Sequence, residues 1–221
     1  MSKRDFQGKI VLITAGGTRE PIDPVRFISN ASSGKMGLAL AEAVHSRGGT
    51  VIFITAAGDC SKKLPFKVIT VETARQMFRE VKLNFRKARI IIMAAAVADF
   101  RPEKFSSKKI KKGGRSEILL KLLRNPDILT WLGRRKGKRI LVGFSAETGH
   151  LEKLTRKKLI DKNADLMVGV NLTQAGGVLG KDFTRVKLIE RAGSLISTPR
   201  LKKRKIADLI LDRLSGRYAE D

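Results

Sequence analysis

Short, nearly continuous apolar runs alternate along the chain with stretches in which apolar residues recur every three or four positions. The first pattern is typical of strands buried on both faces, and the second of helices with one buried face. Strands are expected at residues 9–14, 50–55, 67–71, 90–94, 139–145 and 166–170. Helices are expected at residues 33–47, 73–86, 126–132, 151–162 and 200–214.

Strands that alternate with helices predict an α/β fold with a doubly wound, mostly parallel sheet flanked by helices. A hairpin around Ala192-Gly193 is expected to form a small late lobe over about residues 170–196. Residues 101–117 are rich in Lys, Ser and Gly and are expected to form a mobile loop. No repeat or linker interrupts the sequence, so residues 1–221 are interpreted as one domain.

Ligands of doubly wound sheets bind beyond the carboxyl ends of the strands. In this chain, that rule directs attention to residues 15–35, 94–112, 144–148 and 170–182.

The charge of the chain narrows the kinds of partner that it fits. It carries 46 Lys and Arg against 21 Asp and Glu, a net charge of +25. Residues 101–139 alone hold 14 basic and 3 acidic side chains. Such an excess favours polyanions, with nucleic acid as the first candidate and small phosphorylated substrates as the second. Aromatic residues make up only 5% of the chain, which argues against a base-stacking platform.

Several classes of protein are disfavoured by what the sequence contains. The only cysteine, Cys60, has no partner for an internal disulfide and is interpreted as inert, and with His45 and His150 it makes no recognisable metal motif. No apolar run is long enough for a transmembrane helix, and the first residues lack the apolar region of a secretory signal. We therefore expect a cytoplasmic protein with no membrane partner.

Two segments after the first strand have the residue types of a phosphate site. Gly16-Gly17-Thr18 is a turn whose backbone amides could approach a phosphate, although a plain strand-to-helix turn fits equally well and the GxGxxG pattern is absent. Ser32-Ser33-Gly34 opens a helix with two hydroxyls and a glycine amide, which suits an anion. A simple serine N-cap is the alternative, and the Walker pattern is not met.

Other polar residues near the expected ligand edge each allow a functional and a plain interpretation. Arg26 and Asn30 could bind a carboxylate or phosphate, or be solvated. Asp99 could hold a cation or be an ordinary loop residue. Lys109 lies in a lysine run that could cover a triphosphate or be a solvated face, and Lys158 and Lys162 share one helical face. No Ser–His–Asp set or carboxylate pair is found, which disfavours hydrolysis.

Six segments, in this order, resemble those of phosphopantothenate–cysteine ligases of the bacterial, CTP-dependent type, over roughly residues 8–190. The segments are residues 13–26, 28–37, 94–102, 109–112, 125–129 and 143–148. The resemblance implies a Rossmann-like ligase. Its reaction joins 4′-phosphopantothenate and L-cysteine through an acyl-cytidylate and gives 4′-phosphopantothenoylcysteine, CMP and pyrophosphate.

The resemblance also implies roles for individual residues. Asn30, Lys109 and Arg26 match catalytic positions, with Asn30 handling the acyl-cytidylate and Lys109 neutralising charge. Ser32, Ser33 and Gly34 are expected to bind the substrate or its phosphate, together with Arg26 and Asn30. The expected nucleotide-binding residues are Gly16, Gly17, Thr18, Met93, Ala94, Ala95, Asp99, Lys109, Pro126, Asp127, Ile128, Leu129, Phe144, Lys158 and Lys162.

The implied cofactors are CTP as co-substrate and Mg²⁺, whose ligands the sequence does not identify. Residue spacing alone leaves CTP and ATP both open. No FMN is expected, because the flavin-dependent decarboxylase half of bacterial relatives has no counterpart in these segments, and a separate decarboxylase protein would carry out the next step. The family pattern further implies a homodimer, with residues 170–196 as the expected interface. The loops at 55–59 and 181–184 depart from the family pattern.

Two other functions are alternatives to the ligase. A basic α/β protein that binds nucleic acid is suggested by the charge of +25. A Rossmann oxidoreductase is disfavoured, because both the GxGxxG pattern and an acidic residue at the end of the second strand are missing.

Overall fold

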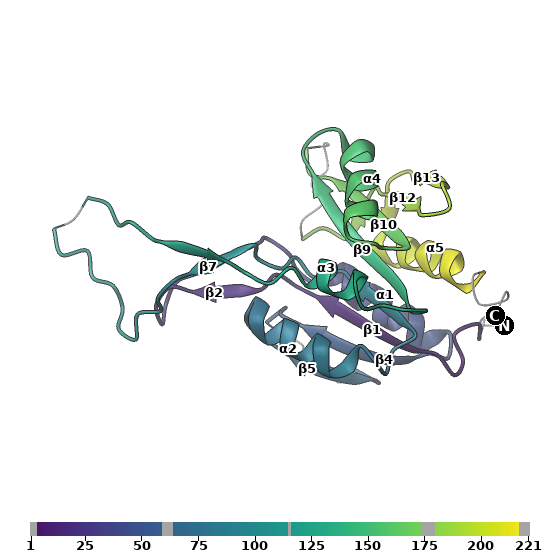
Figure 1. Ribbon diagram of the computed structural model, residues 1–221, viewed down its shortest axis with the longest axis horizontal. Coiled ribbons are helices and arrows are strands. Elements are labelled where there is room, and N and C mark those ends of the chain that lie inside the picture. The colour runs from purple at the N-terminus through teal and green to yellow at the C-terminus, as the bar shows by residue number, and fades with distance from the viewer. Residues whose placement is uncertain (1–3, 59–63, 115, 174–179, 217–221) are drawn as a thin grey trace.

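A computed structural model describes residues 4–58, 64–114, 116–173 and 180–216 of the chain. Its centre is a sheet of eight strands in the order β13-β12-β10-β9-β6-β1-β4-β5, with helices on both faces (Figure 1). The strands from β10 to β5 run parallel to one another, whereas β12 and β13 are antiparallel. The predicted doubly wound, mostly parallel α/β fold is therefore confirmed.

The strands and helices follow the apolar pattern of the sequence closely. The parallel strands are β1 (Ile10–Ala15), β4 (Thr50–Thr55), β5 (Lys67–Thr70), β6 (Ile90–Met93), β9 (Ile140–Glu147) and β10 (Leu166–Asn171). The helices are α1 (Lys35–Ser46), α2 (Ala74–Asn84), α3 (Ile128–Gly133), α4 (Leu151–Asp161) and α5 (Lys203–Ser215). None of these helices has the length and apolar character that crossing a bilayer requires.

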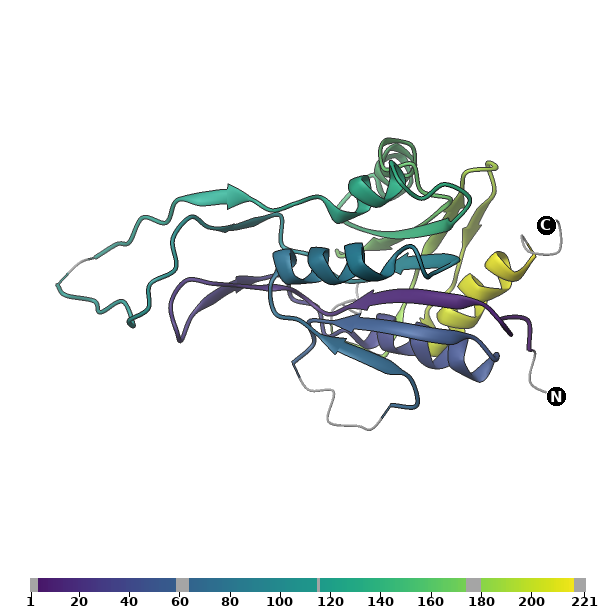
Figure 2. The same cartoon turned by 60° about the horizontal axis from the view of Figure 1, so that its bottom comes forward.

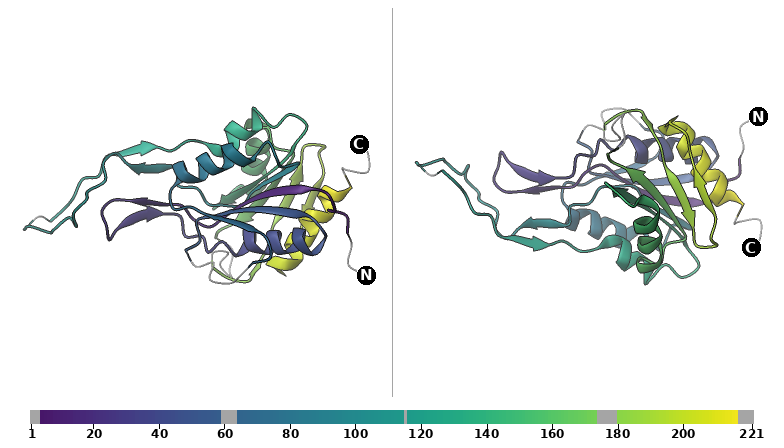
Figure 3. Two further views of the ribbon diagram at one scale, coloured as in Figure 1. Left: turned by 90° about the horizontal axis from the view of Figure 1, so that it is seen from below. Right: turned by 90° about the horizontal axis from the view of Figure 1, so that it is seen from above.

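Helices on opposite faces of the sheet bury opposite sides of each strand. Helices α1 and α5 pack on one face, and α2, α3 and α4 on the other (Figure 3). Within β1, Val11 and Ile13 belong to the first core and Leu12 to the second. Neighbouring residues of a strand point to opposite faces of the sheet, and here both faces are covered. The sequence of the strand is therefore a continuous apolar run.

The expected late hairpin is present, but it is not a separate lobe. Strands β12 (Lys187–Glu190) and β13 (Leu195–Ser197) continue the central sheet through antiparallel pairing of β12 with β10. Leu188 and Ile189 contribute to the cores on the two faces of the sheet. An apolar strand with a free neighbouring edge gains more from joining that edge than from standing alone, which explains the difference. Residues 174–179 of the expected lobe, and Cys60, lie outside the described part of the chain.

The segments that do project from the body are two ribbons near the start and middle of the chain (Figures 1 and 2). One ribbon is β2 (Arg19–Pro21) with β3 (Phe27–Ser29), and the other is β7 (Phe100–Pro102) with β8 (Leu122–Arg124). Strand β2 contacts β7, so the ribbons lie side by side. We call the two ribbons and the loop between β7 and β8 the arm. The expected loop at 101–117 thus begins within β7 and lies between two paired strands. A third short pair, β11 (Phe183–Thr184) with β14 (Leu201–Lys202), leads into α5.

A buried arginine joins the two ends of the described chain. Arg47, at the end of α1, pairs with Asp5 and with Asp212, whose carboxylate lies 2.9 Å from the guanidinium. Its side chain is only 7% exposed and stacks over the ring of Phe6. The hydrogen bond from Arg47 holds the pKa of the Asp5 carboxyl below its usual range.

Replacing Arg47 by Met should therefore destabilise the fold by about 2 kcal/mol, because two carboxylates lose the cation between them. Urea denaturation would measure the change. The matched control is Arg79→Met. The Arg79 side chain is 72% exposed and, among the residues that the structure describes, pairs with its neighbour Glu80 alone. The control should change stability by less than about 0.5 kcal/mol. Equal effects of the two substitutions would contradict the importance given to the buried cluster.

Candidate functional site

The carboxyl ends of the parallel strands surround a cleft of about 730 Å³. Its walls are the segment that follows β6, the turn before α3, the middle of β9 and one face of α4. The predicted residues that line it are Asn30, Met93, Ala95, Asp99, Pro126, Asp127, Ile128, Leu129, Phe144, Lys158 and Lys162. Residues far apart in the sequence are thus brought to one cleft, as expected for the ligand edge of a doubly wound sheet.

Backbone contacts fix the two sides of the cleft relative to each other. The Asn125 N–H donates to the carbonyl of Asp99 over 2.8 Å, and the Asn125 side chain donates to the carbonyl of Ala98 over 2.9 Å. Asn125 was quoted in the resemblance but given no role there. The Asp99 carboxylate is exposed and lines the cleft. It is available to a ligand hydroxyl or to a cation.

Asn30 is held against the segment after β6 by its own side chain. Its amide nitrogen donates to the carbonyl of Val97 over 3.1 Å. Its backbone carbonyl packs against Gly17, where an added Cβ would lie 2.3 Å from the Asn30 oxygen. Glycine at position 17 is therefore required for Asn30 to lie where it does.

The glycine turn after β1 serves packing more than ligand binding. Gly16 has a φ of +81°, and an added Cβ would lie 2.3 Å from the Ala57 nitrogen. The Thr18 N–H donates to the Ala96 carbonyl, and the Thr18 hydroxyl accepts from the Ala98 N–H over 2.9 Å. Of these three residues, Gly17 lines a neighbouring cavity of about 690 Å³, together with Asn30, Ser32 and Ser33. The geometry favours the interpretation of residues 16–18 as a structural turn.

The two cleft lysines each have an acidic partner. Lys158 lies 2.8 Å from the carboxylate of Glu147, and Lys162 pairs with Asp127. Burial acts to raise the pKa of Glu147, but hydrogen bonds from Lys158 and Ser145 outweigh it, so that pKa lies below the usual range. The pKa of Asp127 is lowered in the same way, by Lys162 and by Thr130 against the effect of burial. Both carboxylates therefore stay ionised and hold the lysines at the cleft.

Sequence reasoning gave no role to Glu147. Its neighbours in the sequence, Gly143 to Ala146, carry the apolar strand pattern, and Glu147 stands as the last residue of β9. A single acidic residue at the carboxyl end of a strand was the available signal. Its partner Lys158 comes from the next helix, and only the fold reveals that pairing.

Asp127 has a second role beside its contact with Lys162. It is the N-cap of α3, and its carboxylate accepts a hydrogen bond from the Thr130 N–H over 2.8 Å. The predicted nucleotide-binding residue is therefore also a helix cap, which fixes the turn that forms one wall of the cleft.

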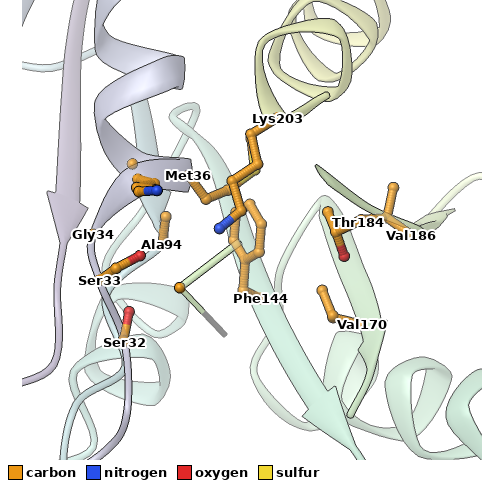
Figure 4. A pocket seen from close by; sticks show the side chains of 13 residues that line it. Ser32, Ser33, Gly34, Met36, Ala94, Phe144, Val170, Thr184, Val186 and Lys203 are labelled. Atoms are coloured by element: carbon orange, nitrogen blue, oxygen red, sulfur yellow. The ribbon is translucent and has the colours of Figure 1, made fainter. Parts of the chain in front are cut away.

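A smaller cavity of about 90 Å³ lies on the other side of Phe144, at the start of α1 (Figure 4). Ser32, Ser33 and Gly34 line it, as does Ala94. The alternative of a serine N-cap is not realised: the N-cap is Gly34, with a φ of +74° and no side-chain cap. The serine hydroxyls face the cavity instead, which leaves them available to a ligand.

Arg26 and Lys109 lie on the arm, and neither belongs to the described lining of the cavities. The Arg26 guanidinium donates to the carboxylate of Asp23 and, over 2.8 Å, to the carbonyl of Ile110. The Ile110 N–H donates to the same Asp23 carboxylate over 3.1 Å. These hydrogen bonds, with that of Arg26 the strongest, hold the pKa of Asp23 far below its usual range. Asp23 thus fixes the loop that carries Lys109 to the β2–β3 ribbon.

The described residues contain no group of three His, Cys, Asp or Glu side chains that would hold a metal ion by themselves. A magnesium ion that arrives with a triphosphate needs only one or two protein carboxylates. Two exposed carboxylates are in the described cleft lining, and since Asp127 pairs with Lys162, Asp99 is the one that fits this need.

Comparison with known proteins identifies relatives along nearly the whole chain. Residues 6–217 match the family model described as "DNA/pantothenate metabolism flavoprotein C-terminal domain". The chain is 42% identical over 216 residues to the coenzyme A biosynthesis bifunctional protein CoaBC of Bacillus subtilis, covering 96% of this chain and 52% of that protein. The Haemophilus influenzae CoaBC is 42% identical over 211 residues, covering 94% and 52%. The chain therefore spans about half the length of these relatives.

A solved structure has the same fold over nearly the whole chain. The crystal structure of the C-terminal domain of a coenzyme A biosynthesis bifunctional protein CoaBC superposes with a TM-score of 0.84 at 35% identity. The match covers 99% of this chain and 100% of that chain. The family resemblance drawn from the sequence is confirmed: this chain belongs to the DNA/pantothenate metabolism flavoprotein C-terminal domain family.

Proposed function

We propose that this chain is a phosphopantothenate–cysteine ligase of coenzyme A biosynthesis, with CTP as the activating nucleotide. The observation that carries the proposal is its match, from end to end, with the C-terminal domain of a CoaBC protein. The cleft adds support, because it gathers the motif residues at the ligand edge of the sheet.

The proposed reaction has two steps and needs no protein nucleophile. The carboxylate of 4′-phosphopantothenate attacks the α-phosphorus of CTP; a P–O bond forms to the acyl oxygen, and the bond to the β-phosphate breaks to release pyrophosphate. The cysteine amine then attacks the acyl carbon, an amide bond forms, CMP leaves, and the amine loses a proton. Negative charge develops on phosphate oxygens in the first step and on the acyl oxygen in the second, so fixed cations and amide donors supply the catalysis.

The residues of the cleft fit these needs. Phe144 and the apolar side chains of Ile128 and Leu129 provide surface for the nucleoside. Lys158 and Lys162 stand beside it with their positions set by Glu147 and Asp127. Asn30 is held at the same edge and is assigned to the acyl-cytidylate. Mg²⁺ would be held by the triphosphate together with Asp99, and would neutralise phosphate charge there.

The proposal includes no flavin. The chain matches about half of the bifunctional relatives, and the half that it matches is assigned the ligase reaction. A decarboxylase activity would then act on the product of the ligase reaction.

A homodimer is also proposed, with the arm rather than residues 170–196 as the contact. Most of the exposed large apolar side chains of the described chain lie on the arm, among them Phe27, Phe100, Phe105 and Leu119, which is 97% exposed. Exposed apolar residues concentrated on a thin projection indicate a surface that a partner covers. Because Arg26 and Lys109 lie on the same arm, dimer formation would also fix the positions of these two residues.

The alternative function, nucleic-acid binding, rests on the charge of +25 and on the lysines of the loop between β7 and β8. It predicts binding to duplex DNA or RNA that weakens steeply as salt rises, without ligase turnover.

The first experiment measures pyrophosphate release with 4′-phosphopantothenate and each nucleoside triphosphate in turn, with Mg²⁺ present. We expect release with CTP, followed by CMP and an amide product only when L-cysteine is added. Release with ATP alone would overturn the nucleotide assignment. If a folded sample releases no pyrophosphate with any triphosphate, the ligase proposal is wrong and nucleic-acid binding becomes the leading function.

Substituting Gly17 by Ala should reduce ligase turnover by at least about tenfold, because the added Cβ displaces Asn30, and misplacement of a catalytic group by an ångström costs that much or more. Steady-state product formation would measure the loss. Gly149→Ala is the control, since no atom lies near its added Cβ and its φ is not positive. Unchanged turnover in the Gly17 variant would show that the position of Asn30 does not matter for the reaction.

Replacing Leu119 by Lys should halve the mass measured by light scattering, because a further cation on each basic arm opposes their contact. Leu83→Lys, on α2 and also exposed, should leave the mass unchanged. A wild-type protein that is already monomeric, or a dimer that survives the Leu119 substitution, would remove the arm as the interface.

A further inference from the structure

Lys203 is a buried cation that forms no ion pair with the described residues. It is the first residue of α5, and only 9% of it is exposed. Its backbone N–H donates to the carbonyl of Asp182 over 2.8 Å, but its ammonium group makes no hydrogen bond or ion pair with the described residues. Burial, together with the nearby charge of Lys35, lowers the pKa of Lys203 and outweighs the opposite effect of the Asp182 carboxylate. Buried charges in proteins are ordinarily paired, so an unpaired one indicates a missing anion.

The ammonium group points into the small cavity beside Phe144. Figure 4 shows the Lys203 side chain reaching from α5 towards Phe144 and the N-terminal end of α1. Ser32 and Ser33 line the same cavity from the α1 side. A cation and two hydroxyls from separate elements therefore converge on one space.

The start of α1 adds further donors. This helix has 12 residues, no side-chain cap and no acidic residue in its first turn. Its first backbone N–H groups thus lack a protein carboxylate, and the helix dipole favours an anion there. The Asp182 carboxylate is the acidic group close to the cavity. It pairs with Lys35 over 2.7 Å and attracts Lys203 only from a greater distance, so one carboxylate serves two lysines.

We propose that Lys203, Ser32, Ser33 and the N-terminus of α1 bind a phosphoryl group, namely the terminal phosphates of the nucleoside triphosphate. This inference rests on the proposed function and deepens it. Sequence reasoning assigned phosphate binding to Ser32, Ser33 and Gly34, but gave no role to Lys203, which comes from the other end of the chain.

The position of the cavity supports the terminal phosphates as its ligand. Phe144 lines both this cavity and the large cleft. Ala94 lines the small cavity, and its neighbours Met93 and Ala95 line the cleft. A nucleotide whose nucleoside lies in the large cleft could therefore reach the small cavity with its phosphates by passing Phe144 and Ala94.

The size and lining of the cavity agree with this assignment. About 90 Å³ is several times the roughly 10–15 Å³ that one water molecule needs, yet far below the 730 Å³ of the nucleoside cleft. Apolar side chains such as Met36, Val170 and Val186 complete the lining. They make the surroundings less polar than bulk water, which strengthens the attraction between Lys203 and an anion.

The test is a titration calorimetry series on the Lys203→Gln variant, with pyrophosphate, CTP, CMP and 4′-phosphopantothenate as separate ligands. We expect pyrophosphate and CTP to bind about tenfold more weakly than to the wild type, the loss typical of one charged hydrogen bond. CMP, which lacks the terminal phosphates, should bind unchanged. Lys205→Gln removes the same charge from an exposed position of α5 and should leave all four affinities unchanged.

Two results would overturn the inference. If pyrophosphate and CTP keep their affinity while only 4′-phosphopantothenate binds more weakly, the cavity holds the phosphate of the acid substrate instead. If all affinities fall equally, or none falls, Lys203 binds no phosphoryl group. Should the Lys203 variant fail to fold, Ser33→Ala tests the same cavity without a change in charge, and should also weaken pyrophosphate binding and spare CMP.

Binding is measured without turnover, so this inference and the ligase proposal fail separately. A protein that binds pyrophosphate through Lys203 but makes no amide would disprove only the ligase. An active ligase whose Lys203→Gln variant binds pyrophosphate and CTP normally would disprove only the phosphate site.

Discussion

In a parallel sheet with helices on both faces, only the ends of the strands and the loops that follow them are free to bind a ligand. Inside such a sheet, the backbone groups are used by the strand ladder and the side chains by two cores, as the alternation of Val11, Leu12 and Ile13 illustrates. A ligand must therefore bind where the strands end and their connections begin. In this chain those connections pack very closely: a Cβ added at Gly17 would lie 2.3 Å from the carbonyl oxygen of Asn30. The position of the candidate site follows from this constraint.

The placement of cations around the site follows a simple electrostatic division. Lys158 and Lys162 touch the large cleft and each has a carboxylate beside it, so each is held in place and partly neutralised. Lys203 faces the small cavity without an ion pair among the described residues, because the nearby Asp182 is paired with Lys35. A nucleoside requires shape and apolar surface, whereas terminal phosphates require uncompensated positive charge. The large cleft therefore suits the nucleoside of a nucleotide, and the small cavity suits its terminal phosphates.

Much of the architecture could be predicted from the sequence. Strands buried on both faces appear as short continuous apolar runs, which differ clearly from the three-to-four-residue apolar spacing of the helices. The strand-end rule singled out the segments 94–112 and 144–148, which hold the cleft residues Asp99 and Phe144, and the family resemblance named Phe144 itself. The β12–β13 hairpin was placed correctly along the chain but wrongly in space: local pattern defines a hairpin, and only the free edge of β10 decides where it pairs. Lys203 and Glu147 were missed because their meaning depends on neighbours from distant segments. A lone lysine in a basic helix looks solvated until the fold shows that it is buried.

The buried cluster around Arg47 has a consequence for how the chain is threaded. Asp5 and Asp212 meet on one guanidinium, so the beginning and end of the described fold come together. Figure 1 places that junction opposite the arm. Because the two ends of the described fold are neighbours in space, the fold does not depend on where along the chain the sequence of elements starts. A circular permutant, with the old ends joined by a short linker and new ends opened in the loop between β7 and β8, would preserve every strand of the central sheet.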